Sequence, residues 1–487
     1  MKTPITRRIF FWTLTISYFI TTAAVLFFVF GYKHDFSSKI FIHTGSISIA
    51  PNPQKNINIL INDKKPQSRL VNFINNSYYI SGLHPRNYEI TVQKNGFKPW
   101  KKEISVHSGV STEFWNITLV RNKYEHMLYN LENIDQFFPA PKENIFAATR
   151  QLGKTLSIHV FDTENNTSTN TFLFPKKEFT KDVRENIEWA PNSKDLIIPL
   201  NTTETTKKDY AIAYTKNDLH ILLSDHISLP MIHNVRWDPK DENTIYLISN
   251  TSLFRTEINP EEKTIILDSV ANDVIAYDFT DDGIYLFTTD YRILYDHNVH
   301  GTNFKEITSF ELPKNTRDVR LIAYDNHRFS IINDEERTLY LYNKGDKSIY
   351  IKKFDTNIIG AHFSDDGKKL LFYSPFEIFV YFARNWDAQP IRKENEMHSI
   401  IRFSQPLDNV HFAKDYEHVM YTVGNEIKMT ELDYRGNRVT ETIMQTSEKN
   451  NTLINKHKKN FLYFIESEKG HTRQLRSIKF PEKETFF

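Results

Sequence analysis

The stretch His362-Phe-Ser-Asp-Asp-Gly-Lys-Lys-Leu-Leu-Phe-Tyr373 carries the pattern on which the interpretation of the fold depends. It contains an aromatic residue, Phe363, then a polar segment, and then an apolar run that ends at Tyr373. The adjacent carboxylates of Asp365-Asp366-Gly367 fit a metal-binding loop or an acid–base pair. They fit a tight turn between strands equally well, because Asp hydrogen-bonds its own backbone and Gly adopts a positive φ.

The same pattern recurs along residues 122–487. Each copy has one apolar anchor residue, a polar turn and an apolar run. The anchors are Phe138, Trp189, Trp237, Phe279, Ile322, Phe363, Phe412 and Ile454. They recur every 41 to 51 residues, which is the period of a four-stranded propeller blade. The sequence therefore predicts an all-β chain in which residues 122–487 form a β-propeller of seven or eight blades.

The number of blades stays open at this point. The copies around Ile322 and Ile454 match weakly, so eight blades and seven blades with an extra strand pair both fit the sequence. The segment from Tyr124 to Gln136 is expected either to begin the ring or to link it to the preceding domain.

The repeats also give an interpretation of Asp365-Asp366-Gly367. The equivalent segments Pro191-Asn192-Ser193 and Pro239-Lys240-Asp241 contain other turn-forming residues and no paired carboxylates. A chemical site is not expected to degenerate in this way around a ring. The stretch is therefore predicted to be a turn between strands.

Two of the copies carry a resemblance to known propeller families. Phe363-Ser-Asp-Asp-Gly-Lys368 is similar to the "F-S-P-D-G-K" signature of TolB-like and WD-repeat-like blades, except at the proline. Trp189-Ala-Pro-Asn-Ser-Lys194 matches it at the aromatic residue, the proline and the lysine. The resemblance implies a propeller fold and carries no function with it.

Composition excludes several classes of site. Among 487 residues there are 61 Lys and Arg, 60 Asp and Glu, and no Cys. An even charge balance gives no reason to expect nucleic-acid binding. The absence of Cys excludes disulfides, zinc–thiolate sites and cysteine nucleophiles, and it is ordinary for a bacterial envelope protein.

The N-terminus predicts a membrane anchor. The 22 residues from Ile9 to Phe30 carry no charge, and a helix of that length reaches about 33 Å, enough to cross a bilayer core. Lys2, Arg7 and Arg8 precede this segment, so residues 1–8 are expected in the cytoplasm and the bulk of the single-pass chain outside it. A cleaved signal peptide is the alternative, but the apolar run is longer than such a peptide requires.

Residues 44–121 predict a small all-β domain. Alternating segments such as Ile57–Ile61, Tyr88–Val92 and Lys102–Val106 are typical of half-buried strands. No helical period interrupts them, and the segment is of a size that favours a compact β-sandwich.

This segment resembles a PEGA domain. The matching residues are Gly45, Pro51, Asn62, Leu83, Pro85, Tyr88, Gly96, Phe97, Pro99 and Trp100. The resemblance implies a surface-exposed structural module without catalytic residues. It departs at Arg86, where the family usually has glycine, so the turn there must avoid or tolerate a positive φ.

The sequence contains no complete catalytic, phosphate-binding or metal-binding motif. Gly-x-Ser-x-Gly, His-Glu-x-x-His, Walker and Gly-x-Gly-x-x-Gly patterns are all missing from the sequence. Asp278, Asp281 and Asp282 lack the spacing of a calcium loop. His297 and His300 form half of a metal site without a third ligand. We therefore expect no catalytic residues, no cofactor and no metal.

The expected function is to display a binding surface, the face of the propeller. A membrane-anchored propeller without catalytic residues suits a scaffold that binds a protein or a cell-envelope glycan. The alternative is a propeller hydrolase or lyase that acts on extracellular polysaccharide or peptide, with carboxylates or histidines from different blades meeting over the channel. A spacer without a ligand is the third hypothesis.

Overall fold

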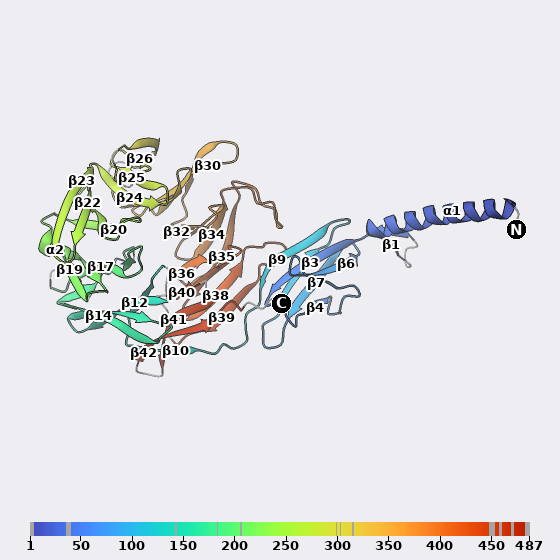
Figure 1. The fold of residues 1–487 in the computed structure, drawn as a ribbon, viewed down its shortest axis with the longest axis horizontal. Coiled ribbons are helices and arrows are strands. Elements are labelled where there is room, and N and C mark those ends of the chain that lie inside the picture. Colours follow the sequence, from blue (N-terminus) through green and yellow to red (C-terminus); the bar gives the residue numbers. More distant parts are fainter. Residues whose placement is uncertain are drawn as a thin grey trace.

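The structure is a computed structural model. It describes residues 4–35, 40–141, 144–182, 184–204, 207–298, 300–301, 303–313, 316–447, 453–456, 460–468 and 472–482. A long helix extends from one end of the molecule, a small β domain follows it, and a larger set of sheets forms the other end (Figure 1).

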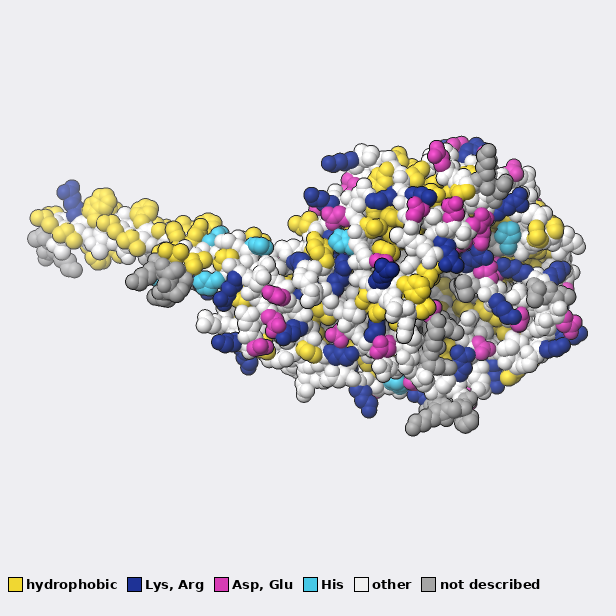
Figure 2. Space-filling view, turned by 180° about the vertical axis from the view of Figure 1, so that it is seen from behind, with side chains coloured by type: hydrophobic (Ala, Val, Ile, Leu, Met, Phe, Trp, Pro, Cys, Tyr) yellow, Lys and Arg dark blue, Asp and Glu magenta, His cyan; other side chains and the backbone are white. Residues whose placement is uncertain are grey.

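The helix α1 spans Pro4–Val29 and is long and apolar enough to cross a membrane over Pro4–Phe27. It begins earlier than the predicted segment at Ile9, because proline is well accommodated in the first turn of a helix. It also ends before Phe30, which lies in a turn, because Gly31 adopts a φ of 81° and stops the helix. Apolar side chains cover most of the visible helix surface (Figure 2).

A short hairpin follows the helix and was missed by the sequence patterns. Its strands β1, Tyr32–Asp35, and β2, Ile40–His43, pair antiparallel. The backbone N–H of Thr44 donates to the carbonyl of Gly31 at 2.9 Å, which fixes the base of the hairpin.

The small domain is a sandwich of two sheets. One sheet has the order β5-β6-β3-β9 and the other has the order β4-β7-β8. The strands are β3 Gly45–Asn52, β4 Asn58–Ile61, β5 Leu70–Asn72, β6 Ser77–Leu83, β7 Asn87–Gln93, β8 Trp100–Ser105 and β9 Ser111–Thr118. Alternate residues of the two sheets, such as Ile59, Ile90 and Phe114, share one apolar core. Arg86 is not among the residues with positive φ, so the turn there avoids that conformation.

Within the described part of the chain, eight sheets of four or five strands form the propeller, and the last of them also contains the early strand β10. Sheet 1 consists of β11 Gln136–Pro139, β12 Ile145–Leu152, β13 Thr155–Asp162 and β14 Thr167–Pro175. Sheet 2 consists of β15 Lys177–Phe179, β16 Glu188–Trp189, β17 Asp195–Thr202, β18 Lys208–Tyr214 and β19 Leu219–Leu222. Sheet 3 consists of β20 Ile232–Trp237, β21 Thr244–Ser249, β22 Ser252–Asn259 and β23 Thr264–Ala271, and sheet 4 consists of β24 Val274–Thr280, β25 Gly283–Thr288, β26 Arg292–Asp296 and β27 Lys305–Ser309. A short helix, α2 Leu223–His226, follows β19 and was not expected.

Sheets 5 to 8 repeat this arrangement. Sheet 5 consists of β28 Val319–Asp325, β29 Arg328–Asn333, β30 Thr338–Lys344 and β31 Ile349–Phe354, and sheet 6 consists of β32 Gly360–Phe363, β33 Lys369–Tyr373, β34 Glu377–Phe382 and β35 Met397–Arg402. Sheet 7 consists of β36 Leu407–Phe412, β37 His418–Val423, β38 Glu426–Glu431 and β39 Thr440–Gln445. Sheet 8 consists of β40 Leu453–Lys456, β41 Phe461–Glu468 and β42 Thr472–Lys479 together with the early strand β10 Met127–Glu132. The predicted connecting segment Tyr124 to Gln136 therefore contains a strand of the last sheet.

An apolar cluster lies between each sheet and the next one. Trp189 and Leu156, for example, share the cluster of sheets 1 and 2. Between sheets 8 and 1, Tyr463 and Leu475 share a cluster with Phe137 and Phe146. Because the last sheet packs on the first, the sheets form a closed ring.

Every predicted anchor residue lies on a strand at one edge of its sheet. This strand comes first in its sheet except in sheet 2, where β15 precedes β16, and in sheet 8, which also contains the earlier strand β10. Phe138 is on β11, Trp189 on β16, Trp237 on β20 and Phe279 on β24. Ile322 is on β28, Phe363 on β32, Phe412 on β36 and Ile454 on β40. The indole N–H of Trp189 donates to the carbonyl of Phe138 at 3.1 Å, so one anchor binds the first strand of the preceding sheet.

Asp365-Asp366-Gly367 is a turn between β32 and β33, as predicted. The Asp366 carboxylate accepts a hydrogen bond from the backbone N–H of Lys368 at 3.0 Å. Gly367 has a φ of 61°, and Ser193 and Tyr416 have φ values of 60° and 51° at the equivalent positions. The turn conformation thus recurs although the residues differ.

The preceding sheet holds this turn. The Tyr324 hydroxyl donates to the carbonyl of Asp365 at 2.7 Å, and Arg328 Nη1 donates to the carbonyl of Gly367 at 2.7 Å. A Cβ at Gly367 would lie 2.2 Å from the Tyr324 ring. Glycine is needed here for close approach between sheets 5 and 6, beyond its positive φ.

We predict that Gly367→Ala destabilises the protein more than Gly153→Ala does. Both glycines have positive φ, which costs an alanine about 1 kcal/mol. Only Gly367 also faces a close neighbour, since nothing lies within 4 Å of a Cβ at Gly153. The steric conflict should add about 1–3 kcal/mol. Denaturant unfolding of the two variants measures the difference, and equal losses would contradict the role of Tyr324.

Candidate functional site

One candidate site is a cavity of about 620 Å³ on the inner side of the ring. Its walls come mainly from the first strands of sheets 3 to 6, which are β20, β24, β28 and β32, and from the segment before β16 in sheet 2. The first strands are therefore the inner strands of the ring. A partner bound in this cavity would touch five sheets at once; we call it the central cavity.

An interruption in sheet 2 brings charge across the central cavity. Strands β15 and β16 both pair with β17, and residues 180–187 leave the sheet between them. From this segment Arg184 forms ion pairs with Asp182, its near neighbour, and with Asp318 of sheet 5. Sheets 3 and 4 separate these partners along the ring, so the Arg184–Asp318 pair bridges the cavity rather than adjacent strands.

Sheet 5 supplies the second arginine of the cavity wall. Arg320 binds Asp334 in a two-point arrangement, with its Nε and Nη2 atoms 2.7 and 2.6 Å from the two carboxylate oxygens. Its Nη2 also donates to the carbonyl of Ile359 at 2.8 Å, which links sheets 5 and 6. A planar guanidinium is well suited to such paired contacts.

A third group of charges runs along three neighbouring sheets. Arg236 on β20 lies 3.5 Å from the Glu188 carboxylate on β16 and forms an ion pair with Asp278 on β24. The second oxygen of Asp278 accepts the backbone N–H of Ala323 on β28 at 2.8 Å. Glu188, Arg236 and Asp278 each precede an anchor residue, so one repeat position supplies the entire chain of contacts.

Two carboxylates at the central cavity have pKa values shifted in opposite directions, because burial raises the pKa of Glu188 whereas Arg184 lowers that of Asp182. Hydrogen bonds from Arg184 lower the pKa of Asp182 to about 2. Burial lowers the pKa of His233 and of His362, and the charge of Arg320 adds to this effect at His362. Histidines with lowered pKa values are neutral near pH 7. A general acid needs a carboxyl group that keeps its proton near neutral pH, whereas the lowered pKa of Asp182 means that this group has lost its proton there.

The cavity rim also contains side chains open to solvent. Met231 is 74% exposed, and Arg317 is exposed beside the Asp318 of the bridging pair. Methionine and arginine are enriched where proteins bind proteins. The rim therefore offers contacts to a partner, whereas the charges inside the cavity are committed to one another.

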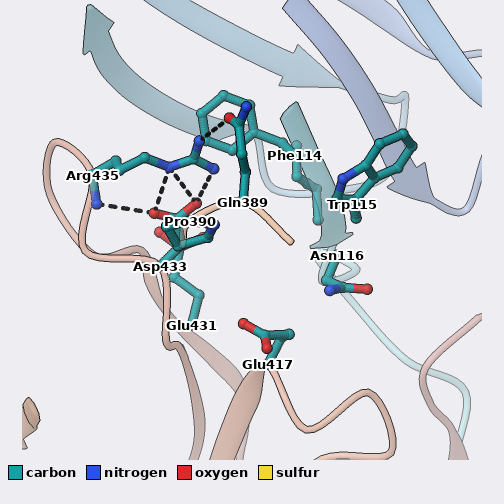
Figure 3. A pocket seen from close by; sticks show the side chains of 10 residues that line it. Phe114, Trp115, Asn116, Gln389, Pro390, Glu417, Glu431, Asp433 and Arg435 are labelled. Atoms are coloured by element: carbon teal, nitrogen blue, oxygen red, sulfur yellow. Dashed lines mark hydrogen bonds and ion pairs between the residues drawn. The ribbon is translucent and has the colours of Figure 1, made fainter. Parts of the chain in front are cut away.

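A second, smaller cavity lies where the small domain meets the ring (Figure 3). Its volume is about 30 Å³, room for a single water molecule. Arg435 points toward Asp433 and Gln389, and its Nη1 donates to the Gln389 side-chain oxygen at 3.0 Å. Gln389 Nε2 in turn donates to the carbonyl of Ser111 in the small domain at 2.7 Å.

Buried charge reinforces this junction. The Lys102 side chain is 0% exposed and forms an ion pair with Glu431 of sheet 7. The indole N–H of Trp100 donates to the other oxygen of Glu431 at 3.1 Å. Since these groups satisfy one another, the junction is a structural contact between domains rather than a site for a ligand.

The sequence predicted the ring but not the central cavity. The anchors lie on its inner strands, whereas Arg184, Arg236 and Arg320 were not singled out from sequence. A signal was present at the position before three anchors, where Glu188, Arg236 and Asp278 stand, and His362 and His411 occupy the same position in two other repeats. Within the residues that the structure describes, no group of three His, Cys, Asp or Glu is placed to hold a metal ion.

Comparisons with known proteins return folds only. No family model matches the chain, and no curated protein is similar to it. Among solved structures, Saccharomyces cerevisiae Sqt1 is 10% identical with a TM-score of 0.45, over 72% of this chain and 97% of that chain. The Dos1 propeller is 10% identical with a TM-score of 0.47, over 75% of this chain and 96% of that chain. Likenesses this weak carry no argument, so the fold assignment rests on the sheets of this chain.

We predict that the pair of Asp182 and Arg184 makes the protein sensitive to acid. Because the pKa of Asp182 is lowered in the folded state, its stabilisation is present above about pH 4 and is lost as the pH falls toward about 2. Asp182→Asn should remove this part of the pH dependence and cost about 1 kcal/mol or less at neutral pH. Thermal unfolding across this pH range measures it, with Asp281→Asn at an exposed turn as the control. Parallel curves for wild type and Asp182→Asn would contradict the assignment.

Proposed function

We propose that this chain is a membrane-anchored, non-catalytic scaffold that presents an eight-bladed propeller outside the cytoplasm and binds a protein partner over the central cavity. The observation that carries the proposal is the cavity itself, whose walls come from five sheets and whose inner charges are paired with one another. Such a surface is rigid before binding, which lowers the entropic cost of holding a partner.

The state of the charged groups favours binding over catalysis. Asp182 and Asp334 both accept hydrogen bonds from arginine, and Asp278 accepts them from Arg236 and from the backbone. A hydrolase or lyase needs one carboxyl group able to give a proton and another able to take one. Asp182 is held ionised and donates no proton near neutral pH. Burial raises the pKa of Glu188, but its carboxylate is occupied by Arg236 at 3.5 Å and by the backbone N–H of Trp237, so this pair of carboxyl groups supports the scaffold hypothesis.

The chemistry of the rim favours a protein over a cell-envelope glycan. Met231 offers exposed apolar surface, and Arg317 offers a planar cation beside an acidic neighbour. This combination is typical of protein interfaces. A glycan partner remains the second class of ligand, and the binding experiment below separates the two.

Three features support the membrane-anchored arrangement. Helix α1 is apolar over the length of a bilayer, none of that span is buried in the protein, and the β domains lie at one of its ends. The PEGA-like domain between them would act as a short stalk. Arg7 and Arg8, in the first turns of α1, then favour a cytoplasmic N-terminus.

We predict that the full chain stays with membranes after alkaline carbonate and high-salt washing. Carbonate removes proteins that are held by charge alone and leaves those with an apolar span. A chain without residues 1–30 should be released, because it lacks α1. Mass spectrometry of the N-terminus tests the signal-peptide alternative. Release of the full chain, or an N-terminus beginning after the apolar run, would contradict the anchor.

We predict that the double variant Met231→Asp/Arg317→Glu loses partner capture. The full chain in detergent serves as bait for solubilised membranes, and retained proteins and glycans are identified by mass spectrometry. Loss of rim contacts should weaken binding about tenfold, equal to about 1.4 kcal/mol.

Arg402→Glu is the matched control for this experiment, because Arg402 is an exposed charge on the outer strand β35. A partner that is captured equally by both variants does not bind at the rim. Retention of glycan alone, lost in the double variant, would shift the proposal to the second class of ligand.

A further inference from the structure

The hairpin β1–β2 packs against the end of α1 through aromatic rings. Tyr32 and Phe41 lie on one face of the hairpin, together with His34 and His43. The Phe27 ring in the last turns of α1 lies 5.0 Å from the Tyr32 ring and 5.8 Å from the Phe41 ring, between centroids. The hairpin is therefore held at the same height along the helix axis as Phe27, which lies near the end of the apolar span.

The hairpin exposes apolar side chains at this height. Ile40 is 57% exposed and Phe41 is 62% exposed. A hollow of about 610 Å³ separates helix and hairpin, and its walls include Ala23, Ala24 and Phe27 on one side and Tyr32 and Phe41 on the other. Lys33 and His34 complete the lining of the hollow, so a mostly apolar and aromatic surface connects α1 to the face of the hairpin that carries Phe41. Ile40 is paired with Asp35 and lies on the opposite face.

The position of the hairpin is fixed from the other side as well. Thr44 Oγ1 donates to the carbonyl of Gly31 at 2.6 Å, and Ser108 Oγ in the small domain donates to the carbonyl of His43 at 2.8 Å. The Lys33 side chain lies against Gly82, where an added Cβ would be 1.9 Å from Nζ. The hairpin thus packs against α1 on one side and against the small domain on the other.

We infer that the β1–β2 hairpin is a second membrane contact, in which Ile40 and Phe41 enter the boundary between headgroups and acyl chains of the bilayer that α1 crosses. This inference rests on the proposed membrane anchor. If Phe27 lies at the end of the membrane span, rings packed on it lie at the bilayer surface. Tyr32 and Lys33 are suited to that boundary, where aromatic rings and snorkelling lysines are favoured.

A lipid surface explains the exposed side chains better than a protein partner does. The hollow between α1 and the hairpin is lined mainly by apolar and aromatic side chains, and its polar members are Lys33 and His34. A lysine beside aromatic rings suits the headgroup boundary of a bilayer, whereas protein interfaces are surrounded by a polar rim. The hairpin would then restrict tilting of the small domain against the membrane, because helix and hairpin contact the bilayer at two points.

The absence of cysteine from the chain allows a direct test. Ile40→Cys and Phe41→Cys, each in the full chain, are spin-labelled and reconstituted into vesicles of phosphatidylcholine and phosphatidylglycerol. Collision rates with oxygen, which concentrates in lipid, and with a water-soluble nickel chelate report the depth of each label. Leu26→Cys in α1 is the control for the span. Leu70→Cys is the control for water, because Leu70 is 62% exposed, as Phe41 is, on a strand of the small domain.

The expected result is a nickel collision rate several-fold lower at residues 40 and 41 than at residue 70, with an oxygen rate close to that at residue 26. Nickel accessibility equal to that at residue 70 would overturn the inference while residue 26 still reports the anchor. Low rates for both reagents would show that protein, such as a second copy of this chain, covers the hairpin instead of lipid. High nickel accessibility at residue 26 would overturn the anchor and the inference together.

Discussion

Strand β10 pairs with β42 and completes the last sheet, so the two ends of the ring sequence meet in one sheet. The Tyr129 hydroxyl lies 2.9 Å from Ser477 Oγ, and Gln474 Nε2 donates to the Glu132 carboxylate at 2.8 Å. Every apolar cluster of the ring lies between two sheets. Without this pairing, sheets 8 and 1 would each expose an apolar face and an unpaired strand edge. The central cavity depends on closure because its walls are assembled from five sheets.

The junction between the small domain and sheet 7 connects the closed ring to the part of the chain that carries α1. Breaking a buried ion pair leaves an uncompensated charge, which costs far more than the net gain from forming the pair. Lys102 and Glu431 therefore penalise any separation of the two domains. Val439 of sheet 7 packs against the core of the small domain, and Val120 at the end of that domain packs into the cluster of sheets 7 and 8. Charged and apolar contacts together join the small domain to the ring.

The sequence was sufficient for features with a local cause. The turn at Asp366 and Gly367 follows from backbone hydrogen bonding and positive φ, and the anchors recur because each inner strand needs one. The small domain was predicted from its alternation, and β3 continues through Pro51 to Asn52. Beyond Ile49, β3 pairs with β9 and no longer with β6, so one side of the strand needs no N–H for pairing and tolerates proline.

Features that depend on contacts between residues far apart in the chain could not be predicted from the sequence. The Arg184–Asp318 pair joins residues 134 positions apart, and it exists only because residues 180–187 leave their sheet over the cavity. The hairpin β1–β2 was missed since its strands have four residues each, too few to establish a period. The arginines of the cavity wall were missed because ion pairing depends on which strands the ring brings together.

The pairing of charges inside the cavity has a consequence for specificity. Arg184, Arg236 and Arg320 already hold carboxylates, so an anionic ligand would have to displace Asp182, Asp278 or Asp334 to reach them. Displacement would leave those carboxylates without their partners in a partly buried setting, which is costly. A small anion is therefore disfavoured. A partner that spans the cavity and binds the rim leaves the inner pairs intact, and for that partner the paired charges act as a rigid floor beneath the interface.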